Sequence, residues 1–506
     1  MIEPALEALS LTLRPDTLIF LVLGVLLGIV VGILPGLGGV VGLSVLLPFV
    51  YGMEPAQGMA MMLGLAAVTN TSDVFPSALM GVPGASSAQA TILDGYPLTR
   101  QGKGLTVLAA SFSASLAGGL IGAFVLYFCI FAARPIILTF GSPELFMLIL
   151  LGLSMVGVLS RGATRAGLLA AFIGLILGAV GAAPTAPEYR FTFDQLYLFD
   201  GIPLAVLALG LFAVPEIVDL LVEGGSIAER GELRGSRKEG ILAVWTHRWL
   251  VVRSAIVGTF IGFLPGLGSS VGHWMAYGLA SQTRKDNKFG KGDIRGVIAP
   301  DSASNAGDGG ALVPTLLFGI PGSGSFAVLL GGMTLLGLQP GPSMLNDDLP
   351  LVVSTVWTLT LANVLATLVC LGASMYVVKL TQVPAQKLAP FVLVIIVVAA
   401  YQSSRHWGDI LTLLVLGTIG WIMKQLNWPR APLLVGFVLS VPAERYLWTS
   451  TATFGASWLT DPLVIVIGVV IAIVLLSGTM LQRKMEETTQ VASRVEEPRS
   501  SGGAST

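Results

Sequence analysis

Long apolar runs, separated by short polar segments and interrupted by Gly and Pro, dominate the hydrophobic pattern of this chain. Residues 104–133 and 462–481 each supply the roughly 20 apolar residues that a helix needs to cross a bilayer. Comparable runs lie at residues 17–34, 145–159, 166–183, 202–222, 350–378, 387–401 and 408–426. The pattern predicts an all-α polytopic membrane protein with about 10–12 helical elements, some of them broken helices or re-entrant hairpins.

Composition supports this fold class. Of the 506 residues, 54% are apolar and 11% are charged, whereas about a quarter of the residues of a soluble domain are charged. The two cysteines, Cys129 and Cys370, lie inside apolar runs, so we expect no disulfide framework, metal cluster or cofactor. The expected surroundings are membrane lipid, and nucleic acid is not an expected partner.

The chain contains two related halves. GIVVGILPGLGG at 28–39 returns as GTFIGFLPGLGS at 258–269, and PSALMGVPGASS at 76–87 returns 238 residues later as PTLLFGIPGSGS at 314–325. Internal duplication of this kind organises many transporters. The predicted organisation is an N-terminal segment at 1–16, repeat one at 17–222, a charged linker at 223–248, repeat two at 249–458, a C-terminal transmembrane helix at 459–481 and a polar, disordered tail at 482–506.

Each half carries two Pro-Gly breaks. Pro removes a backbone donor and Gly admits left-handed backbone, so the pair stops a helix. Inside hydrocarbon such a break is tolerated only against protein or a water-lined cavity. A lone glycine pair is better explained by helix packing, but four breaks at equivalent positions indicate a transport site. They lie at residues 35–38, 83–84, 265–268 and 321–322.

The charges that flank the first break of each half indicate orientation. The positive-inside rule places basic flanks in the cytoplasm. The first hairpin is flanked mainly by Glu3, Glu7, Asp16 and Glu54, and the second by Arg248, Arg253, Arg284, Lys285, Lys288, Lys291 and Arg295. The second hairpin is therefore predicted to open to the cytoplasm and the first outward, which makes the repeats inverted.

Several longer motifs carry a family resemblance. They are GILPGLGG at 32–39, LLP at 46–48, GVPGASSAQATILDGYP at 81–97, YRFTFDQLYLFDGIP at 189–203, FLPGLGSS at 263–270, FGIPGSGS at 318–325, GLQPGP at 337–342 and NWPRAPLLVGFVLSVPAER at 427–445. In this order and spacing, over nearly the whole chain up to about residue 480, the sequence resembles the large membrane subunit of the tripartite tricarboxylate transporters.

The resemblance implies a secondary transporter of bacterial inner membranes that imports an organic di- or tricarboxylate by alternating access. It implies two partners, a small four-helix membrane subunit and a periplasmic solute-binding protein, and a sodium or proton gradient as the driving force. No GxxxxGK[ST] sequence is present, so an ATP motor in this chain is not supported. TNTSDVFP at 69–76 departs from the YGGS-like pattern of citrate-type members, so the carboxylate is left open.

Helix N-termini that follow the Pro-Gly breaks are the expected anion site, because they offer unpaired N–H groups and a partial positive charge. Serine at such a position is equally well explained as an N-cap. The substrate-binding candidates are Gly36, Gly38, Gly84, Ser86, Ser87, Gly266, Gly268, Gly322, Ser323 and Ser325.

Polar residues just ahead of the breaks are the candidates for a coupling-ion site. Carboxylate, amide and hydroxyl oxygens suit hard cations. When the two halves are aligned with a shift of 238 residues, Asn70 corresponds to Asp308. The coupling-ion candidates are Asn70, Ser72, Asp73, Asn305 and Asp308. Asp301 is equally well explained as a solvated residue of a cytoplasmic loop.

Two further polar residues have competing explanations. His273 is suited to carry a proton near neutral pH, although a polar contact between helices is the commoner role of such a residue. Asp94, in the sequence DGYP, matches the family motif but is explained equally well as a turn-initiating residue.

Two other classes of protein compete with a transporter. An intramembrane aspartyl-type enzyme needs two carboxylates on neighbouring helices, whereas Asp73 and Asp308 lie in Gly- and Ser-rich segments that we expect to be loop-like. A passive anion channel needs one open path, which paired helix breaks suit less well.

Overall fold

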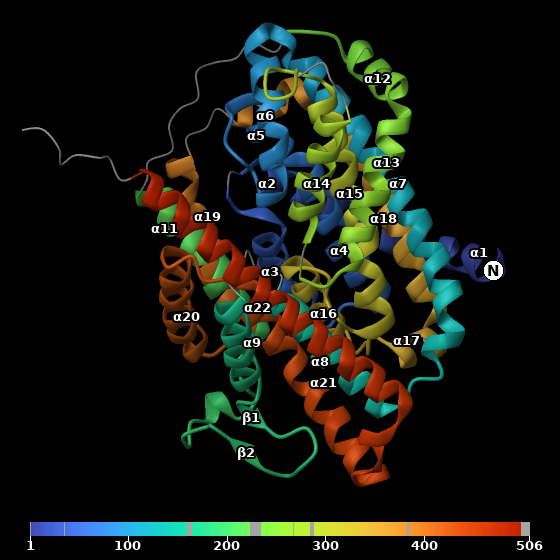
Figure 1. The fold of residues 1–506 in the computed structure, drawn as a ribbon, viewed down its shortest axis with the longest axis vertical. Coiled ribbons are helices and arrows are strands. Elements are labelled where there is room, and N and C mark those ends of the chain that lie inside the picture. Colours follow the sequence, from blue (N-terminus) through green and yellow to red (C-terminus); the bar gives the residue numbers. More distant parts are fainter. Residues whose placement is uncertain are drawn as a thin grey trace, which may run out of the picture.

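The computed structural model describes residues 2–34, 36–158, 164–222, 234–266, 268–283, 288–381 and 385–496. These residues form a bundle of helices, with one short antiparallel pair of strands, β1 (Gly181–Ala182) and β2 (Tyr189–Arg190), at its lower end in Figure 1. The all-α architecture predicted from the apolar runs is confirmed.

The N-terminal half is a succession of helices with short connections. Its α-helices are α1 (Ile2–Thr12), α2 (Pro15–Ile33), α3 (Gly38–Val50), α4 (Pro55–Ser72), α5 (Val74–Met80), α6 (Gln89–Leu98), α7 (Gly104–Ile137), α8 (Ser142–Val158), α9 (Thr164–Gly178), α10 (Leu204–Ala208) and α11 (Val214–Val222). Short 3-10 or π segments are η1 (Ser86–Ala88), η2 (Thr99–Lys103), η3 (Leu196–Leu198) and η4 (Leu209–Ala213).

The C-terminal half follows a comparable order. It contains α12 (Arg237–Thr246), α13 (Arg248–Phe263), α14 (Gly268–Gln282), α15 (Arg295–Phe318), α16 (Gly324–Leu335), α17 (Pro342–Asp347), α18 (Leu349–Thr381), α19 (Ala385–Ser404), α20 (Trp407–Gln425), α21 (Ala431–Phe454), the 3-10 turn η5 (Ser457–Thr460) and α22 (Pro462–Glu496). In Figure 1, α22 runs obliquely across the bundle.

Five helical segments of the described chain are long and apolar enough to cross a membrane. They are Pro15–Ile33, Gln89–Ile137, Leu204–Val222, Leu349–Val377 and Trp407–Gln425. Each contains or overlaps an apolar run that the sequence predicted to be helical. Shorter apolar helices occupy Gly38–Val50, Ser142–Val158, Thr164–Gly178, Gly324–Leu335, Ala389–Ser404 and Pro462–Gly478. These lengths are those of a polytopic membrane protein with incomplete helices.

The expectation of loop-like segments around the central carboxylates is wrong for Asp308. This residue lies well inside α15, and Asp73 lies at the junction of α4 and α5. Pro300 and Pro314 fall within α15 without ending it. Packing explains the difference, because α15 is buried along its length between α7 and α13, and tertiary contacts override weak helix propensity.

The segments outside the two main halves are more helical than their polar composition indicates. Part of the charged segment at 223–248 forms α12, which packs against α7, and residues 223–233 lie outside the described chain. Helix α22 continues to Glu496, beyond the end of its apolar run near residue 481. Residues 497–506 of the predicted disordered tail lie outside the described chain.

Glycines set the separation of the helices that carry the central polar residues. A Cβ at Gly28 of α2 would overlap the carbonyl oxygen of Leu65 in α4, and a Cβ at Gly258 of α13 would overlap that of Ala303 in α15. The backbones of these two helix pairs therefore touch directly, as in other small-residue packings of membrane helices.

We predict that Gly258→Ala destabilises the protein by about 1–3 kcal/mol, because the added methyl group must force α13 and α15 apart. The matched control is Gly278→Ala in α14, where a Cβ would meet no atom within 4 Å. This control should keep or raise stability, since Ala favours a helix over Gly. Thermal unfolding in detergent measures both, and equal midpoints for the two variants would contradict this account of the packing.

Candidate functional site

The two Pro-Gly breaks of each half bind one another. Gly36 N–H donates to the carbonyl of Gly84 at 3.0 Å, and Gly266 N–H donates to that of Gly322, also at 3.0 Å. Gly36 and Gly266 adopt left-handed backbone, with φ of 84° and 86°, which residues with a side chain rarely adopt. Each half thus joins the end of one broken helix to the start of another through a backbone hydrogen bond.

These contacts involve residues of the predicted anion site. The amides of Gly36 and Gly266 are already paired, and Gly84 N–H donates to Ser77 Oγ at 3.2 Å. Gly322 N–H donates to Thr315 Oγ1 at 3.4 Å. The four amides therefore hold the breaks together. The reason is the requirement to pair backbone groups in an apolar interior.

Gly38 and Gly268 are the first residues of α3 and α14. Their backbones are left-handed, with φ of 57° and 67°. A Cβ at Gly38 would lie 3.7 Å from Ala85, and one at Gly268 would lie 3.6 Å from Ser323. The starts of these helices therefore sit against the residues that follow the second break of the same half.

The serines after the breaks divide into different roles. Ser323 Oγ accepts the N–H of Phe326 at 3.5 Å and so caps α16, which is the N-cap role that the sequence allowed. Ser325 lies against α3, because a Cβ at Gly39 would be 3.2 Å from its Oγ. The side chain of Ser86 lies outside the described atoms. Ser87 is buried and faces the central carboxylates.

Three of the predicted coupling-ion residues, Asn70, Asp73 and Asp308, converge on one buried cluster. Asn70 Nδ2 lies 3.0 Å and 2.9 Å from the two carboxylate oxygens of Asp308. Ser87 Oγ lies 3.2 Å from Asn70 Oδ1 and 3.0 Å from Asp73 Oδ2. The structure thus brings together Asn70, Asp73, Ser87 and Asp308, from both halves of the chain.

This cluster has more acceptors than hydrogens. The Ser87 hydroxyl has one hydrogen for the oxygens of Asn70 and Asp73. Asp73 Oδ1 is buried and has no hydrogen-bond partner within the described chain. Buried polar atoms are normally paired, so this arrangement can accept a cation that binds through oxygen. Among the described residues no three His, Cys, Asp or Glu are placed to hold a metal ion, so amide and hydroxyl oxygens have to contribute.

Asn305 and Ser72 are placed differently from the other candidates. Asn305 Nδ2 donates to Thr71 Oγ1 at 2.7 Å and to Asn363 Oδ1 at 2.8 Å. Sequence reasoning missed Asn363, although a single amide in the apolar run at 350–378 was a usable signal. The Ser72 hydroxyl lies 3.1 Å from the carbonyl oxygens of Gly28 and Val68, so it contributes to packing between α2 and α4.

A second buried cluster contains His273. Its Nε2 lies 3.1 Å from Thr91 Oγ1 and 3.3 Å from Asp301 Oδ1, and all three residues are fully or almost fully buried. Asp301 is therefore not the solvated loop residue that was one explanation of its position. His273 makes the polar contact between helices that was the commoner expectation.

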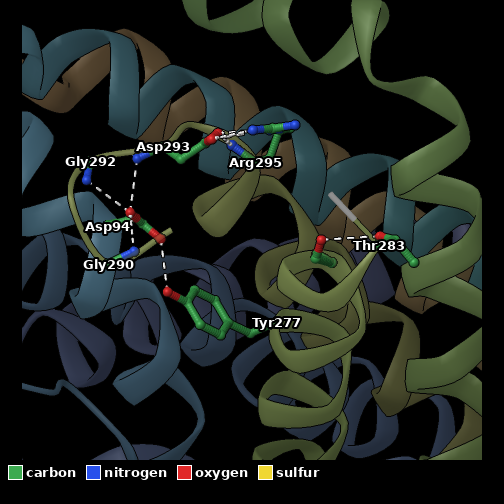
Figure 2. A network of polar contacts seen from close by, with 8 residues as sticks. Asp94, Tyr277, Thr283, Gly290, Gly292, Asp293 and Arg295 are labelled. Carbon is green, nitrogen blue, oxygen red and sulfur yellow. Dashed lines mark hydrogen bonds and ion pairs between the residues drawn. The ribbon is translucent and has the colours of Figure 1, made fainter. Parts of the chain in front are cut away.

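Asp94 lies inside α6 and does not initiate a turn. Figure 2 shows its carboxylate among the backbone of the loop before α15 and the side chain of Tyr277. Oδ1 accepts the N–H groups of Gly290, Gly292 and Asp293 at 2.8–2.9 Å, and Oδ2 accepts the Tyr277 hydroxyl at 2.9 Å. One carboxylate from the first half thus holds a loop of the second.

Asp293 in the same loop forms an ion pair with Arg295 (Figure 2). Its burial disfavours the charged form, but the hydrogen bonds and charge of Arg295 outweigh this and keep the pKa of Asp293 below its usual value. The loop therefore carries its negative charge at neutral pH and keeps its ion pair.

We predict that Asp94→Asn loosens the loop at 288–294, because an amide has one acceptor oxygen and offers N–H groups where the loop also has donors. Hydrogen exchange of a peptide that covers this loop should rise about tenfold or more, the equivalent of losing one charge-assisted hydrogen bond. Asp347→Asn, at an exposed position in α17, is the control. Unchanged exchange in Asp94→Asn would show that other contacts hold the loop.

Paired helix breaks and buried carboxylates among apolar helices are the features of a membrane transport protein. Comparison with known proteins agrees with this class: the model of the tripartite tricarboxylate transporter TctA family matches residues 18–435. The chain belongs to this family, which is one of transporters and not of enzymes. The resemblance seen in the sequence motifs is confirmed.

Two relatives come from Agrobacterium vitis. The chain is 30% identical, over 86% of its length and 87% of the relative's, to an uncharacterized 52.8 kDa protein in the TAR-I ttuC' 3' region. It is 29% identical, over 38% of its length and 79% of the relative's, to an uncharacterized protein in the TAR-II ttuC' 3' region. No solved structure matches the chain.

Proposed function

We propose that this chain is the permease subunit of a binding-protein-dependent secondary transporter in a bacterial inner membrane. It imports an organic di- or tricarboxylate by alternating access, and a sodium or proton gradient drives the uptake. Its partners are a small four-helix membrane subunit and a periplasmic solute-binding protein. Family membership supports a tripartite transport system, and the central cluster supports coupling to a cation.

The main support is the contact between Asn70 and Asp308, which are 238 residues apart and occupy equivalent positions in the two halves. In an arrangement with two-fold pseudo-symmetry, equivalent positions touch only near the axis. The backbone bonds from Gly36 to Gly84 and from Gly266 to Gly322 also recur in both halves. The axis then passes through the cluster, where transporters built from repeats bind their substrates.

The charges favour inversion of the repeats over a parallel arrangement. The loop before α15 contains Lys288 and Lys291 and leads into Arg295 at the start of the helix, whereas the connection after α3 contains Glu54. The positive-inside rule assigns these two loops to opposite sides of the membrane.

The excess of acceptor oxygens supports a coupling cation in the cluster. Asp73 and Asp308 lie close enough for their charges to interact, and a cation between the oxygens of Asp73, Asn70 and Ser87 offsets this repulsion. The organic anion requires donors, and its site is proposed at the starts of α16 and η1, since the amides of the four Pro-Gly glycines are paired.

A passive anion channel is the alternative from another class. The intramembrane enzyme loses its support, although Asp308 does lie in a helix, because the family is one of transporters. Dependence of uptake on an ion gradient separates a coupled transporter from a channel.

We predict that Asp308→Asn lowers solute uptake about 10- to 100-fold, because it removes a buried charge from the cation site and a hydrogen-bonded partner of Asn70. Cells that express the chain with the proposed small subunit and solute-binding protein are tested with radiolabelled citrate and succinate. Asp347→Asn is the matched control and should keep uptake.

Uptake that persists after the sodium and proton gradients are both collapsed would favour the channel and contradict coupling. Full uptake by Asp308→Asn would contradict the cation site. A proteolytic activity of the wild type that disappears in Asp308→Asn would instead favour the intramembrane enzyme.

We predict that cysteines introduced at Glu54 and at Lys288 react from opposite sides of the membrane. Both positions are exposed, and Cys129 and Cys370 are first replaced by Ala to give a background without thiols. An impermeant maleimide applied to whole cells and to inverted vesicles measures the side. Labelling of both positions from the same side would rule out inverted repeats.

A further inference from the structure

The buried cluster of His273, Thr91 and Asp301 is separate from the hydrogen bonds of the central cation cluster. Thr91 comes from α6 of the first half, and His273 and Asp301 come from α14 and α15 of the second. The three residues therefore join helices from both halves, so relative movement of the halves would change their contacts.

The hydrogen bonds define which nitrogen of His273 carries a hydrogen in the neutral form. Thr91 Oγ1 donates to Asp301 Oδ1, so the single hydroxyl hydrogen is used. His273 Nε2 faces two acceptors, Thr91 Oγ1 at 3.1 Å and Asp301 Oδ1 at 3.3 Å, and must be the nitrogen that donates. The opposite tautomer would set the lone pair of Nε2 against both of these oxygens.

Two atoms of this cluster are then unpaired. Within the described chain, His273 Nδ1 and Asp301 Oδ2 are buried and have no hydrogen-bond partner. The residues are only about 1% exposed. A neutral imidazole beside a carboxylate leaves a net charge of −1 in an apolar interior, which is unfavourable. One proton on Nδ1 gives an imidazolium and a carboxylate with no net charge.

We propose that His273 and Asp301 form a proton-binding site that takes up one proton when the helices close over it and releases it when they separate. Thr91 is a positioning residue that orients the pair. The proton arrives from solution and adds to Nδ1 of His273, so the charge of the cluster changes from −1 to zero. This inference rests on the proposed transport function and assigns the proton to a site distinct from the one that binds the cation through oxygen.

Most of the charged groups near this pair make contacts of their own. Asp73 lies within electrostatic reach of Asp301. Asp94 accepts the Tyr277 hydroxyl, Arg295 pairs with Asp293, and Arg253 donates to Thr283, so these groups are engaged elsewhere. Other titratable groups on the helices packed against α14 and α15 include Tyr96 on α6, Tyr127, Cys129 and Arg134 on α7, Arg248 on α13 and Asp308 on α15.

The test observes the proton directly in the full-length chain. The protein has three histidines, so with His247→Gln and His406→Gln the ¹⁵N-histidine NMR spectrum in lipid nanodiscs reports His273 alone. We expect a neutral form protonated on Nε2 and a single protonation step on Nδ1. Asp301→Asn should weaken proton binding at least tenfold, because it removes the adjacent negative charge, and Asp347→Asn should not change it.

Thr91→Val keeps both titratable groups and should also shift the protonation midpoint, so it tests the site if Asp301→Asn fails to fold. A His273 midpoint that is the same in the wild type, Asp301→Asn and Thr91→Val would overturn the proposal. A neutral form protonated on Nδ1 would do the same.

Uptake of radiolabelled citrate or succinate by the assembled transporter tests whether this site takes part in transport. An imposed proton gradient should stimulate the wild type and His247→Gln, and this stimulation should be lost in His273→Gln. Wild-type uptake that responds to sodium and not to a proton gradient would overturn the proton site and leave the transporter standing. If no ion gradient affects uptake, the proposed function fails, and the NMR result still decides whether the proton site exists.

Discussion

Pairing of backbone groups at the helix breaks is the constraint on which the centre of this protein depends. A helix that stops in an apolar interior leaves N–H and C=O groups that cannot turn to water. Here each break finds its partner in the other break of the same half, through Gly36 with Gly84 and Gly266 with Gly322. The breaks therefore form as pairs, and removing one would leave the other with an unsatisfied group.

This pairing also positions the polar side chains. Asp73 immediately precedes α5, and Ser87 follows the second break, so the paired backbones bring a carboxylate and a hydroxyl together. Direct backbone contact at glycine keeps α4 against α2 and α15 against α13. Close packing excludes water and so strengthens the interactions among the buried charges. The electrostatics of the cluster are thus a consequence of the glycines around it.

The sequence predicted the apolar helices and the residues of the central cluster, because both follow from local patterns. It did not predict that Asn70 and Asp308 touch. Equivalent positions in two repeats have the same place in each repeat, but this does not fix the distance between them. It also did not predict that the amides of Gly36 and Gly266 are paired, because their partners lie in another break. The Gly- and Ser-rich sequence around Asp308 also misled its assignment to a loop-like segment, since burial outweighed local propensity.

The contact between positions 70 and 308 has a consequence for how such a protein can arise. On the proposed duplication, an ancestor with identical halves had the same residue on both sides of the axis. Two aspartates would repel one another, and two asparagines would carry no charge. Only after the halves became different could one side supply the charge and the other the donors. Divergence of the two copies was therefore a precondition for this pair, because a dimer of identical chains cannot make it.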